Sequence, residues 1–285
     1  MEASVYIPII SDYGFKATFG NDTDDLFLRT ALQALLKSQT PIKSVRFDKN
    51  AFEGLTIDSR SGVFDLSCTD ENGSHFIVEM QLGYATHFVQ RMKYYTLQKF
   101  NTLVEKGDFD YANLPKIYTI ALLEKNILPT KHFHTVSNLR SEEGEIIDRQ
   151  MTFITVELSK FKKKIADIET DLDKLVYTMQ TIHTAEPTQY PAFWTEEWLK
   201  RAIDELDTRK MTPEKRAYFA RVTAANAEAV KAEKQKIQEA REAENLSVKN
   251  ETVKNLLGLG ILTTSQIAKT VGVSEDFVLK ISGNK

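Results

Sequence analysis

The sequence predicts an α/β fold in which a mixed central sheet is flanked by helices and followed by a helical C-terminal half. Two observations support this prediction. Strand-like runs are confined to the chain before Leu158, and helical periodicity dominates after it. With 285 residues, 42% hydrophobic residues, 27% charged residues and a formal net charge of −3, the composition is typical of one or two soluble globular domains.

The first part of the chain mixes the two kinds of element. One helix is expected over residues 23–38, and a second over 87–105. Strands are expected over 42–47, 62–69, 74–82, 116–123, 133–137 and 151–158. Helices placed between strands in this way favour an α/β domain with a mixed sheet.

The second half is expected to be helical, with segments 172–182, 195–206 and 213–245. The last of these is rich in Ala, Glu and Lys, which is typical of a solvated helix or a semi-rigid spacer and indicates a boundary near Asn245. We therefore divide the chain into a core (1–165), a helical extension with a long charged helix (166–245) and a tail (246–285).

The tail shows the pattern of three short helices. The first is expected over 247–257, the second from a cap at Thr264 and the third from a cap at Ser274. Its Ala, Gly and spaced aliphatic residues are typical of a helix-turn-helix. Two interpretations stay open: contact with DNA, or a small helical cap or oligomerisation element.

Several classes of protein are excluded by composition. The single cysteine, Cys68, cannot form an intramolecular disulfide, so we expect a reduced, cytoplasmic protein. No apolar run approaches the ~20 residues of a membrane span, and the acidic start is unlike a secretory signal. The five histidines show no metal-ligand spacing, and no nucleotide-binding glycine loop is present.

The most informative stretch is GVFDLSCTDENGSHFIVEMQ, residues 62–81. DENG is a turn signal between two alternating runs, so the stretch predicts a β-hairpin. A three-residue loop over 71–73 would place Asp65 directly opposite Glu79. One face would then be apolar, formed by Phe64, Leu66, Cys68, Phe76, Val78 and Met80, and the other face would display Asp65, Ser67, Ile77, Glu79 and Gln81.

Two carboxylates placed across a hairpin repel each other unless a cation or a proton lies between them. A hard divalent ion such as Mg²⁺ or Mn²⁺ is the simplest remedy, since both ions prefer oxygen ligands. The alternative is a solvent-facing pair on a half-exposed sheet.

Asp65, followed after a hairpin by Glu79, Met80 and Gln81, resembles the PD-(D/E)XK nuclease motif. The segments SDYGFKATFGN, DENG with FIVEMQ, and QRMKYYTLQ resemble, in the same order, the PD-(D/E)XK nuclease family transposases over about residues 9–160. The resemblance implies a restriction-endonuclease-like core and an Mg²⁺-dependent (or Mn²⁺-dependent) DNA endonuclease that acts in transposition or recombination. It also implies Asp65 and Glu79 as metal ligands, with the Met80 carbonyl as a third.

This chain departs from the common motif at Gln81, where Lys is usual, although Gln is typical of the transposase-like branch. An uncharged amide can orient the attacking water but cannot neutralise a phosphate. We expect Lys16 or Arg91, with Lys93 as a further candidate, to supply the missing positive charge.

Tyr95 shares a helical face with Arg91 and is expected in the core. Other features keep two interpretations. Asp12 either reaches the metal through water or caps a helix. The basic run SKFKKK (Lys160, Lys162, Lys163 and Lys164) either touches DNA or is a solvated surface. The whole chain is either a nuclease or a non-catalytic DNA-binding or assembly protein that keeps the fold, and homo-oligomerisation is left open.

Overall fold

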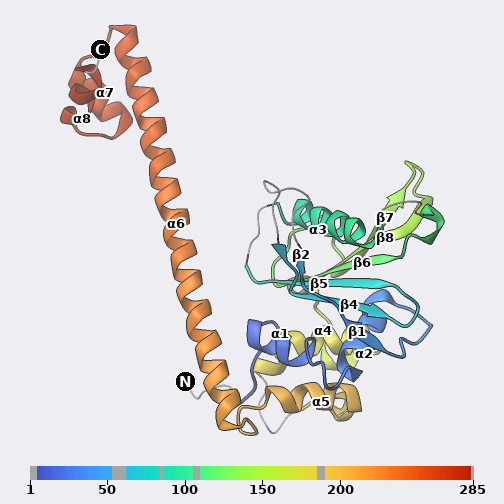
Figure 1. Cartoon of the computed structure of the whole chain (residues 1–285). Helices are drawn as coiled ribbons and strands as arrows, with labels where there is room; N and C mark the ends of the chain where they lie inside the picture. Colours follow the sequence, from blue (N-terminus) through green and yellow to red (C-terminus); the bar gives the residue numbers. More distant parts are fainter. Residues whose placement is uncertain (1–4, 53–61, 84–86, 105–109, 185–189, 284–285) are drawn as a thin grey trace. The chain divides into compact units, whose positions relative to one another are not determined.

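The computed structural model describes residues 5–52, 62–83, 87–104, 110–184 and 190–283. The chain divides into two compact units, 1–219 and 220–285, and each is described by itself. The first unit contains a six-stranded sheet with the order β1-β4-β5-β6-β8-β7 (Figure 1). The β5/β6 and β6/β8 pairs are parallel and the other neighbours are antiparallel, so the predicted mixed sheet is confirmed.

Each expected strand has its counterpart. The sheet is made of β1 (Val45–Phe47), β4 (Leu66–Asp70), β5 (His75–Gln81), β6 (Ile117–Leu123), β7 (His134–Arg140) and β8 (Ile146–Glu157), and β2 (Ala51–Phe52) pairs with β3 (Gly62–Val63) apart from it. The central strand β6 is almost entirely buried, which explains its continuous apolar sequence IYTIALL. The strand predicted over 62–69 is broken, because the chain leaves the ladder between β3 and β4.

Helices cover both faces of this sheet (Figure 1). On one face lies α3 (Phe88–Leu103), and on the other lie α1 (Asp12–Thr18), α2 (Leu26–Leu36), α4 (Asp171–Thr181) and α5 (Glu197–Leu206). Short 3-10 turns connect these elements: η1 (Tyr111–Asn113), η2 (Leu158–Lys160), η3 (Ile165–Asp167), η4 (Ile182–Thr184) and η5 (Ala192–Thr195). His134 at the start of β7 is buried, with its Nε2 2.7 Å from the carbonyl oxygen of Leu35 on α2.

Helix α1 was not predicted, and its start is set by Ser11. The Ser11 hydroxyl accepts the Gly14 N–H (3.0 Å) and donates to the Pro8 carbonyl (2.7 Å), so the N-cap is Ser11 and Asp12 belongs to the first turn. A Cβ at Gly14 would lie 1.9 Å from the Pro8 oxygen. Only glycine fits this position, which explains the glycine in the segment SDYGFK.

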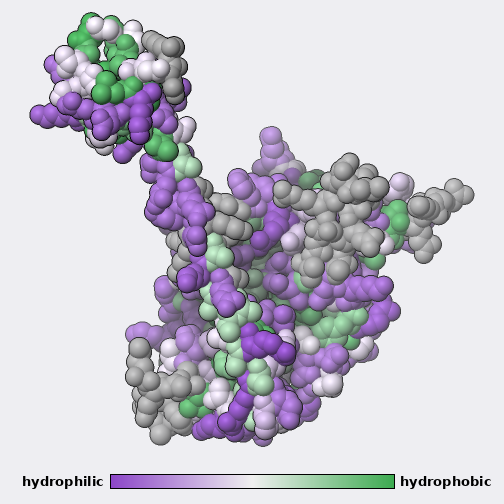
Figure 2. All heavy atoms as spheres, turned by 60° about the vertical axis from the view of Figure 1, so that its left-hand side comes forward, coloured by the Kyte–Doolittle hydropathy of each residue, from purple (hydrophilic) through white to green (hydrophobic). Residues whose placement is uncertain are grey.

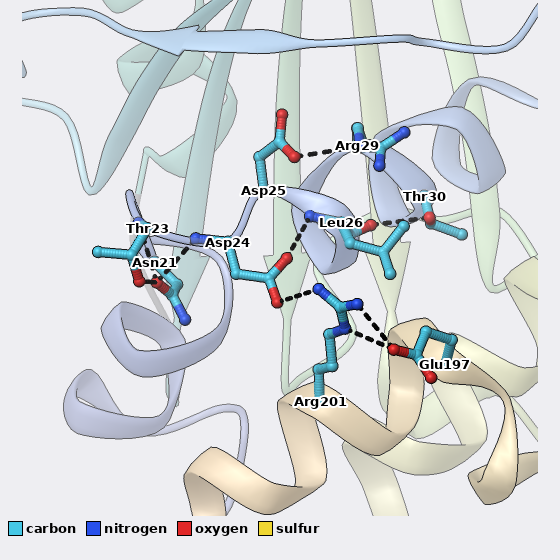
Figure 3. Close-up of polar contacts among 9 residues, drawn as sticks. All are labelled: Asn21, Thr23, Asp24, Asp25, Leu26, Arg29, Thr30, Glu197 and Arg201. Carbon is cyan, nitrogen blue, oxygen red and sulfur yellow. Dashed lines mark hydrogen bonds and ion pairs between the residues drawn. The ribbon is translucent and has the colours of Figure 1, made fainter.

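The segment between α1 and α2 is attached to α5 by Arg201 (Figure 3). The Arg201 guanidinium donates to Asp24 (2.7 Å) and to Glu197 on its own helix (2.7 and 2.9 Å). Asp24 also accepts the N–H of Leu26 (3.1 Å), the first residue of α2. The Asp24 carboxylate therefore accepts an N–H at the start of α2 and links that helix to α5, which lies much later in the chain.

The second unit contains most of α6 (Pro213–Leu259), followed by α7 (Thr264–Val271) and α8 (Glu275–Ser282). The separate helix expected over 247–257 is wrong, because α6 runs through Asn245 without interruption. No glycine or proline follows Pro213 until Gly258, so nothing in the backbone chemistry stops the helix earlier. Many of the side chains visible along α6 are hydrophilic (Figure 2). The division of the chain at residues 165 and 245 stays a prediction.

The last two helices are short and are joined by a tight turn. Thr263, one residue before the expected cap, caps α7; Gly272 makes the turn at φ 68°, and Ser274 caps α8 as predicted. The small core consists of Val253, Ile267, Ala268 and Val278. None of the helices that the structure describes is long and apolar enough to cross a membrane.

Helix α3 is fixed to the sheet by a buried polar network. The Lys99 ammonium donates to Asp48 (2.9 Å), which follows β1, and to Ser67 on β4 (3.1 Å). Asp48 also accepts the Thr69 hydroxyl (2.8 Å), and His75 Nδ1 lies 3.4 Å from the same carboxylate. Although partial burial opposes ionisation, the hydrogen bonds from His75, Lys99 and Thr69 hold the pKa of Asp48 well below its usual range.

We expect Lys99→Met to lower the free energy of unfolding by about 3–5 kcal/mol, because it leaves a buried carboxylate without its cation. Lys99→Arg, which keeps the charge, should lose less. Since folding lowers the pKa of Asp48, the Lys99–Asp48 ion pair stabilises the protein above about pH 4. The difference in free energy of unfolding between the wild type and Lys99→Met should therefore shrink as the pH falls below that value. Urea unfolding at several pH values measures both effects, and equal stabilities at pH 7 would contradict the expectation.

Candidate active site

The β4–β5 hairpin has the predicted register. Leu66 pairs with Val78 and Thr69 pairs with His75, so the loop consists of residues 71–73. Gly73 adopts φ 77°, a conformation that glycine takes without strain, and its N–H donates to the Asp70 carbonyl (3.1 Å). The local turn chemistry therefore fixes which residues face each other further along the hairpin.

At the open end of the hairpin, backbone N–H groups of each strand donate hydrogen bonds to an acidic side chain of the other strand. The Asp65 N–H donates to Glu79 Oε1 (3.1 Å), and the Met80 N–H donates to Asp65 Oδ2 (2.8 Å). The register thus brings the predicted pair, Asp65 and Glu79, into contact. Each carboxylate keeps one oxygen outside these two bonds.

The chain bends at Asp65, and this changes one detail of the expected faces. Because β4 begins only at Leu66, Phe64 lies on the α3 side, against Ile77 and the edge of the Tyr95 ring at 5.4 Å between centroids. The prediction that Phe64 shares the face of Leu66 and Cys68 is wrong for this reason. The bend lets the Asp65 carboxylate take the place of a backbone acceptor for Met80.

Glu79 is 5% exposed beneath α3, so the alternative of a solvent-facing pair does not hold for this residue. Burial, and after it the negative charge of Asp65, raises the pKa of Glu79 to about 8. The pKa of Asp65 is also raised, chiefly because protein atoms displace water around its carboxyl, although the Met80 N–H and the charge of Arg91 act in the opposite direction. The pair therefore holds a proton more tightly than two free carboxyls.

The backbone of Met80 turns toward Asp65. Within a β-strand the N–H and C=O of one residue point to the same side, and the next residue points to the other. The Met80 N–H meets Asp65, and the Gln81 carbonyl accepts the Glu124 N–H on the β6 side (3.1 Å). The Met80 carbonyl consequently opens on the side of the two carboxylates.

These groups fit a hard divalent ion. Two carboxylates and a backbone carbonyl are the oxygen donors that Mg²⁺ or Mn²⁺ prefers, and such ions retain several water ligands. Among the residues that the structure describes, no cluster of three or more His, Cys, Asp or Glu side chains offers a metal site. Asp65 and Glu79 would therefore have to act with the carbonyl and water, not with a third acidic side chain.

Gln81 is fully engaged within the protein. Its amide oxygen accepts a hydrogen bond from the Arg91 guanidinium (2.8 Å), and its amide nitrogen donates to the Leu82 carbonyl (2.8 Å). Arg91 also stacks over the Phe88 ring, 5.1 Å from its centroid. Gln81 therefore contacts a cation, although its uncharged amide did not suggest such a contact.

The other predicted cations lie further out. Lys16 is exposed and paired with Asp12 on α1, with 3.1 Å between Nζ and Oδ1. The charge of Asp12 raises the pKa of Asp65 and that of Lys16 lowers it, so this ion pair lies on the Asp65 side of the site. Lys93 is exposed on α3.

The basic run SKFKKK is only partly available to a ligand. Lys160 is nearly buried against Glu157, and Lys163 pairs with the buried Asp173 at 2.8 Å. Only Lys162 and Lys164 are exposed without a role in these pairs. Glu157 lies only three residues before Lys160, so this pair is local in the sequence. Asp173 follows Lys163 by ten residues, and its contact with Lys163 was not predicted.

Tyr95, expected in the core, is half-buried against Phe64, and it also lies close to the acidic pair. Burial, and after it the charge of Glu79, raises the pKa of the Tyr95 hydroxyl. The contacts of Lys99 with Asp48 and Ser67, which hold α3 on the sheet, were not predicted from the sequence. The four-residue spacing of Arg91, Tyr95 and Lys99 along α3 was the available signal, since it places all three over the same strip of sheet.

A family model described as PD-(D/E)XK nuclease family transposase matches residues 9–245, well over half of the chain. The chain belongs to this family. The fold class predicted from the sequence agrees with it, and the family relates the protein to nucleases and transposition. Neither a curated protein nor a solved structure shows significant similarity to the chain.

In the absence of metal, the raised pKa of Glu79 predicts an unusual pH dependence of the folding stability of this transposase-family protein. The folded state binds a proton more tightly than the unfolded state between about pH 4.5 and pH 8, so the stability should fall as the pH rises through this range. Glu79→Gln keeps an acceptor for the Asp65 N–H and removes the titration. We expect it to be more stable than the wild type at pH 8, by on the order of a few kcal/mol, and to differ little near pH 5.

Chemical denaturation of both proteins in EDTA at pH 5 and pH 8 measures this difference. Glu71→Gln, at the exposed turn of the same hairpin, serves as the control, because its carboxylate does not belong to the pair. A stability difference for Glu79→Gln that is the same at both pH values would contradict the raised pKa.

Proposed function

We propose that the protein is an Mg²⁺-dependent or Mn²⁺-dependent DNA endonuclease that acts in transposition or recombination. The observation that supports this most directly is the interlocked pair of Asp65 and Glu79, with the Met80 carbonyl opening beside it. A buried carboxylate such as Glu79 next to a second carboxylate costs stability, so the presence of both in one place favours a cationic ligand.

In this proposal Asp65, Glu79 and the Met80 carbonyl hold the ion. When bound, a divalent ion lowers the pKa of a coordinated water and neutralises charge on the scissile phosphate. To hold the ion, Asp65 and Glu79 would both have to be deprotonated, and their backbone hydrogen bonds would keep the two carboxylates in place.

Arg91 supplies the positive charge that a Lys at position 81 would otherwise carry. Gln81 holds the guanidinium at the end of β5, and the fork of the guanidinium can bind two phosphate oxygens. Lys16 borders the site and, once separated from Asp12, contributes a second charge toward the DNA backbone.

The C-terminal helices are proposed to bind DNA or a partner. The two short helices joined by a tight turn, and the exposed lysines Lys249, Lys254, Lys269 and Lys280, support this contact. The acidic first turn of α8, with Glu275 and Asp276, disfavours close approach of that turn to phosphates. Contact through the lysines is therefore the more favourable arrangement.

We expect purified protein to nick or cut supercoiled plasmid only when Mg²⁺ or Mn²⁺ is present. Asp65→Asn and Glu79→Gln keep the size of each side chain and an acceptor oxygen, so the hairpin should stay folded while cleavage falls more than about 100-fold. Glu71→Gln, on the same hairpin, should cleave like the wild type. Agarose gel assays with circular dichroism as a folding check measure both properties.

The competing function is a non-catalytic DNA-binding or assembly protein that retains the fold. Calorimetric titration distinguishes the two, because the nuclease should bind Mn²⁺ and the Glu79→Gln variant should not. Wild-type protein that binds no divalent ion, or variants that cleave as fast as the wild type, would favour the competing function.

The contact between Gln81 and Arg91 predicts coupled effects of substitution. Arg91→Ala should slow single-turnover cleavage by about 100-fold, because it removes a charge next to the phosphate. Gln81→Ala should also slow it while leaving metal affinity nearly unchanged, since Arg91 loses its hydrogen bond. Gln81→Lys should be faster than Gln81→Ala and should partly rescue Arg91→Ala, because it returns an ammonium near the missing guanidinium.

Lys93→Ala is the matched control, since Lys93 lies on the same helix but is exposed. It should leave the rate within a few-fold of the wild type. If Gln81→Ala cleaves as fast as the wild type, Gln81 does not position Arg91 for the reaction.

A further inference from the structure

Strand β7 forms one end of the six-stranded sheet, and no strand in the described part of the chain pairs with its outer edge. The β7–β8 hairpin projects from the edge of the sheet (Figure 1). Two apolar side chains of β7 are exposed, Val136 by 41% and Leu139 by 61%. A long edge strand with exposed apolar residues is a ready template for pairing with another strand.

The direction of the backbone groups shows which residues can accept a partner. The Glu157 N–H donates to the Phe133 carbonyl (2.7 Å), so Phe133 faces β8. Because the direction alternates along a strand, the backbone groups of His134, Val136 and Asn138 point away from β8. These three residues form a regular outward edge.

The irregular pairing of the hairpin does not disturb this edge. Ser137 is opposite Phe153, and Leu139 is opposite Asp148, so the additional residues lie in β8 and not in β7. A bulge in the edge strand itself would twist the edge away and block pairing. Here β7 remains extended from His134 to Ser137.

The charges at the two ends of β7 indicate the partner. Exposed Lys131 precedes the strand. Exposed Arg140 ends the strand, but three exposed carboxylates, Glu142, Glu143 and Glu145, follow it and make this end acidic overall. A second copy of β7 in the antiparallel direction brings the basic start of each strand to the acidic end of the other, twice by symmetry. A parallel copy would bring like charges together.

We infer that β7 pairs antiparallel with β7 of a second copy of this chain, centred on Ser137, so that one sheet continues through a homodimer. Lys131 precedes Ser137 by as many residues as Glu143 follows it, which places the opposite charges together in this register. Val136 then exchanges backbone hydrogen bonds with Asn138 of the other copy, and the two Ser137 side chains lie closest together. The inference does not depend on nuclease activity.

Cysteine cross-linking of the full chain tests the register. In Ser137→Cys the two sulfurs should form a disulfide under mild oxidation, because the facing Cα atoms would be about 4.5 Å apart. The native Cys68 is buried and should stay unreactive. Leu139→Cys is the control on the same strand, since its two copies would be about 13 Å apart and should not cross-link.

Charge reversal tests the orientation. Glu142→Lys with Glu143→Lys should weaken dimerisation by about tenfold in sedimentation velocity, and adding Lys131→Glu should restore it. A wild-type protein that is monomeric at all accessible concentrations would overturn the inference. Dimerisation that is unchanged by these charge reversals would also overturn it. So would equally efficient cross-linking of Leu139→Cys and Ser137→Cys.

Discussion

The site depends on one reciprocal arrangement, in which the backbone of each strand of the hairpin holds the carboxylate of the other. Asp65 gives its N–H to Glu79, and Met80 gives its N–H to Asp65. Hydrogen bonds to the charged form partly offset the repulsion and the burial that raise both pKa values. The arrangement exists only in one register, and the turn with Gly73 fixes that register.

Helix α3 extends this arrangement across the sheet. Arg91 meets Gln81 at one end, Tyr95 lies over the acidic pair, and Lys99 reaches Ser67 and Asp48 at the other end. A buried ammonium is costly unless it is paired, so the Asp48 contact determines where α3 rests. The same contact therefore sets the position of Arg91, two turns earlier on the helix.

Sequence could predict what local chemistry determines. The hairpin, its loop and the meeting of Asp65 with Glu79 follow from a turn signal and from alternation, and the mixed sheet follows from the spacing of strands and helices. Contacts between distant segments could not be predicted in this way. Nothing in the run SKFKKK shows that Lys163 folds onto Asp173 of α4, and composition alone suggested a break in α6 where the backbone has none.

The substitution of Gln for Lys at position 81 becomes intelligible through this tertiary contact. An ammonium on β5 would face the Arg91 guanidinium at hydrogen-bond distance, and two cations at that separation repel each other. A neutral amide removes the repulsion and offers an acceptor for the guanidinium. Positions 81 and 91 are consequently one unit, in which the strand supplies the anchor and the helix supplies the charge. Because Lys99 anchors that helix, the placement of the charge depends on the packing of α3 as much as on the hairpin.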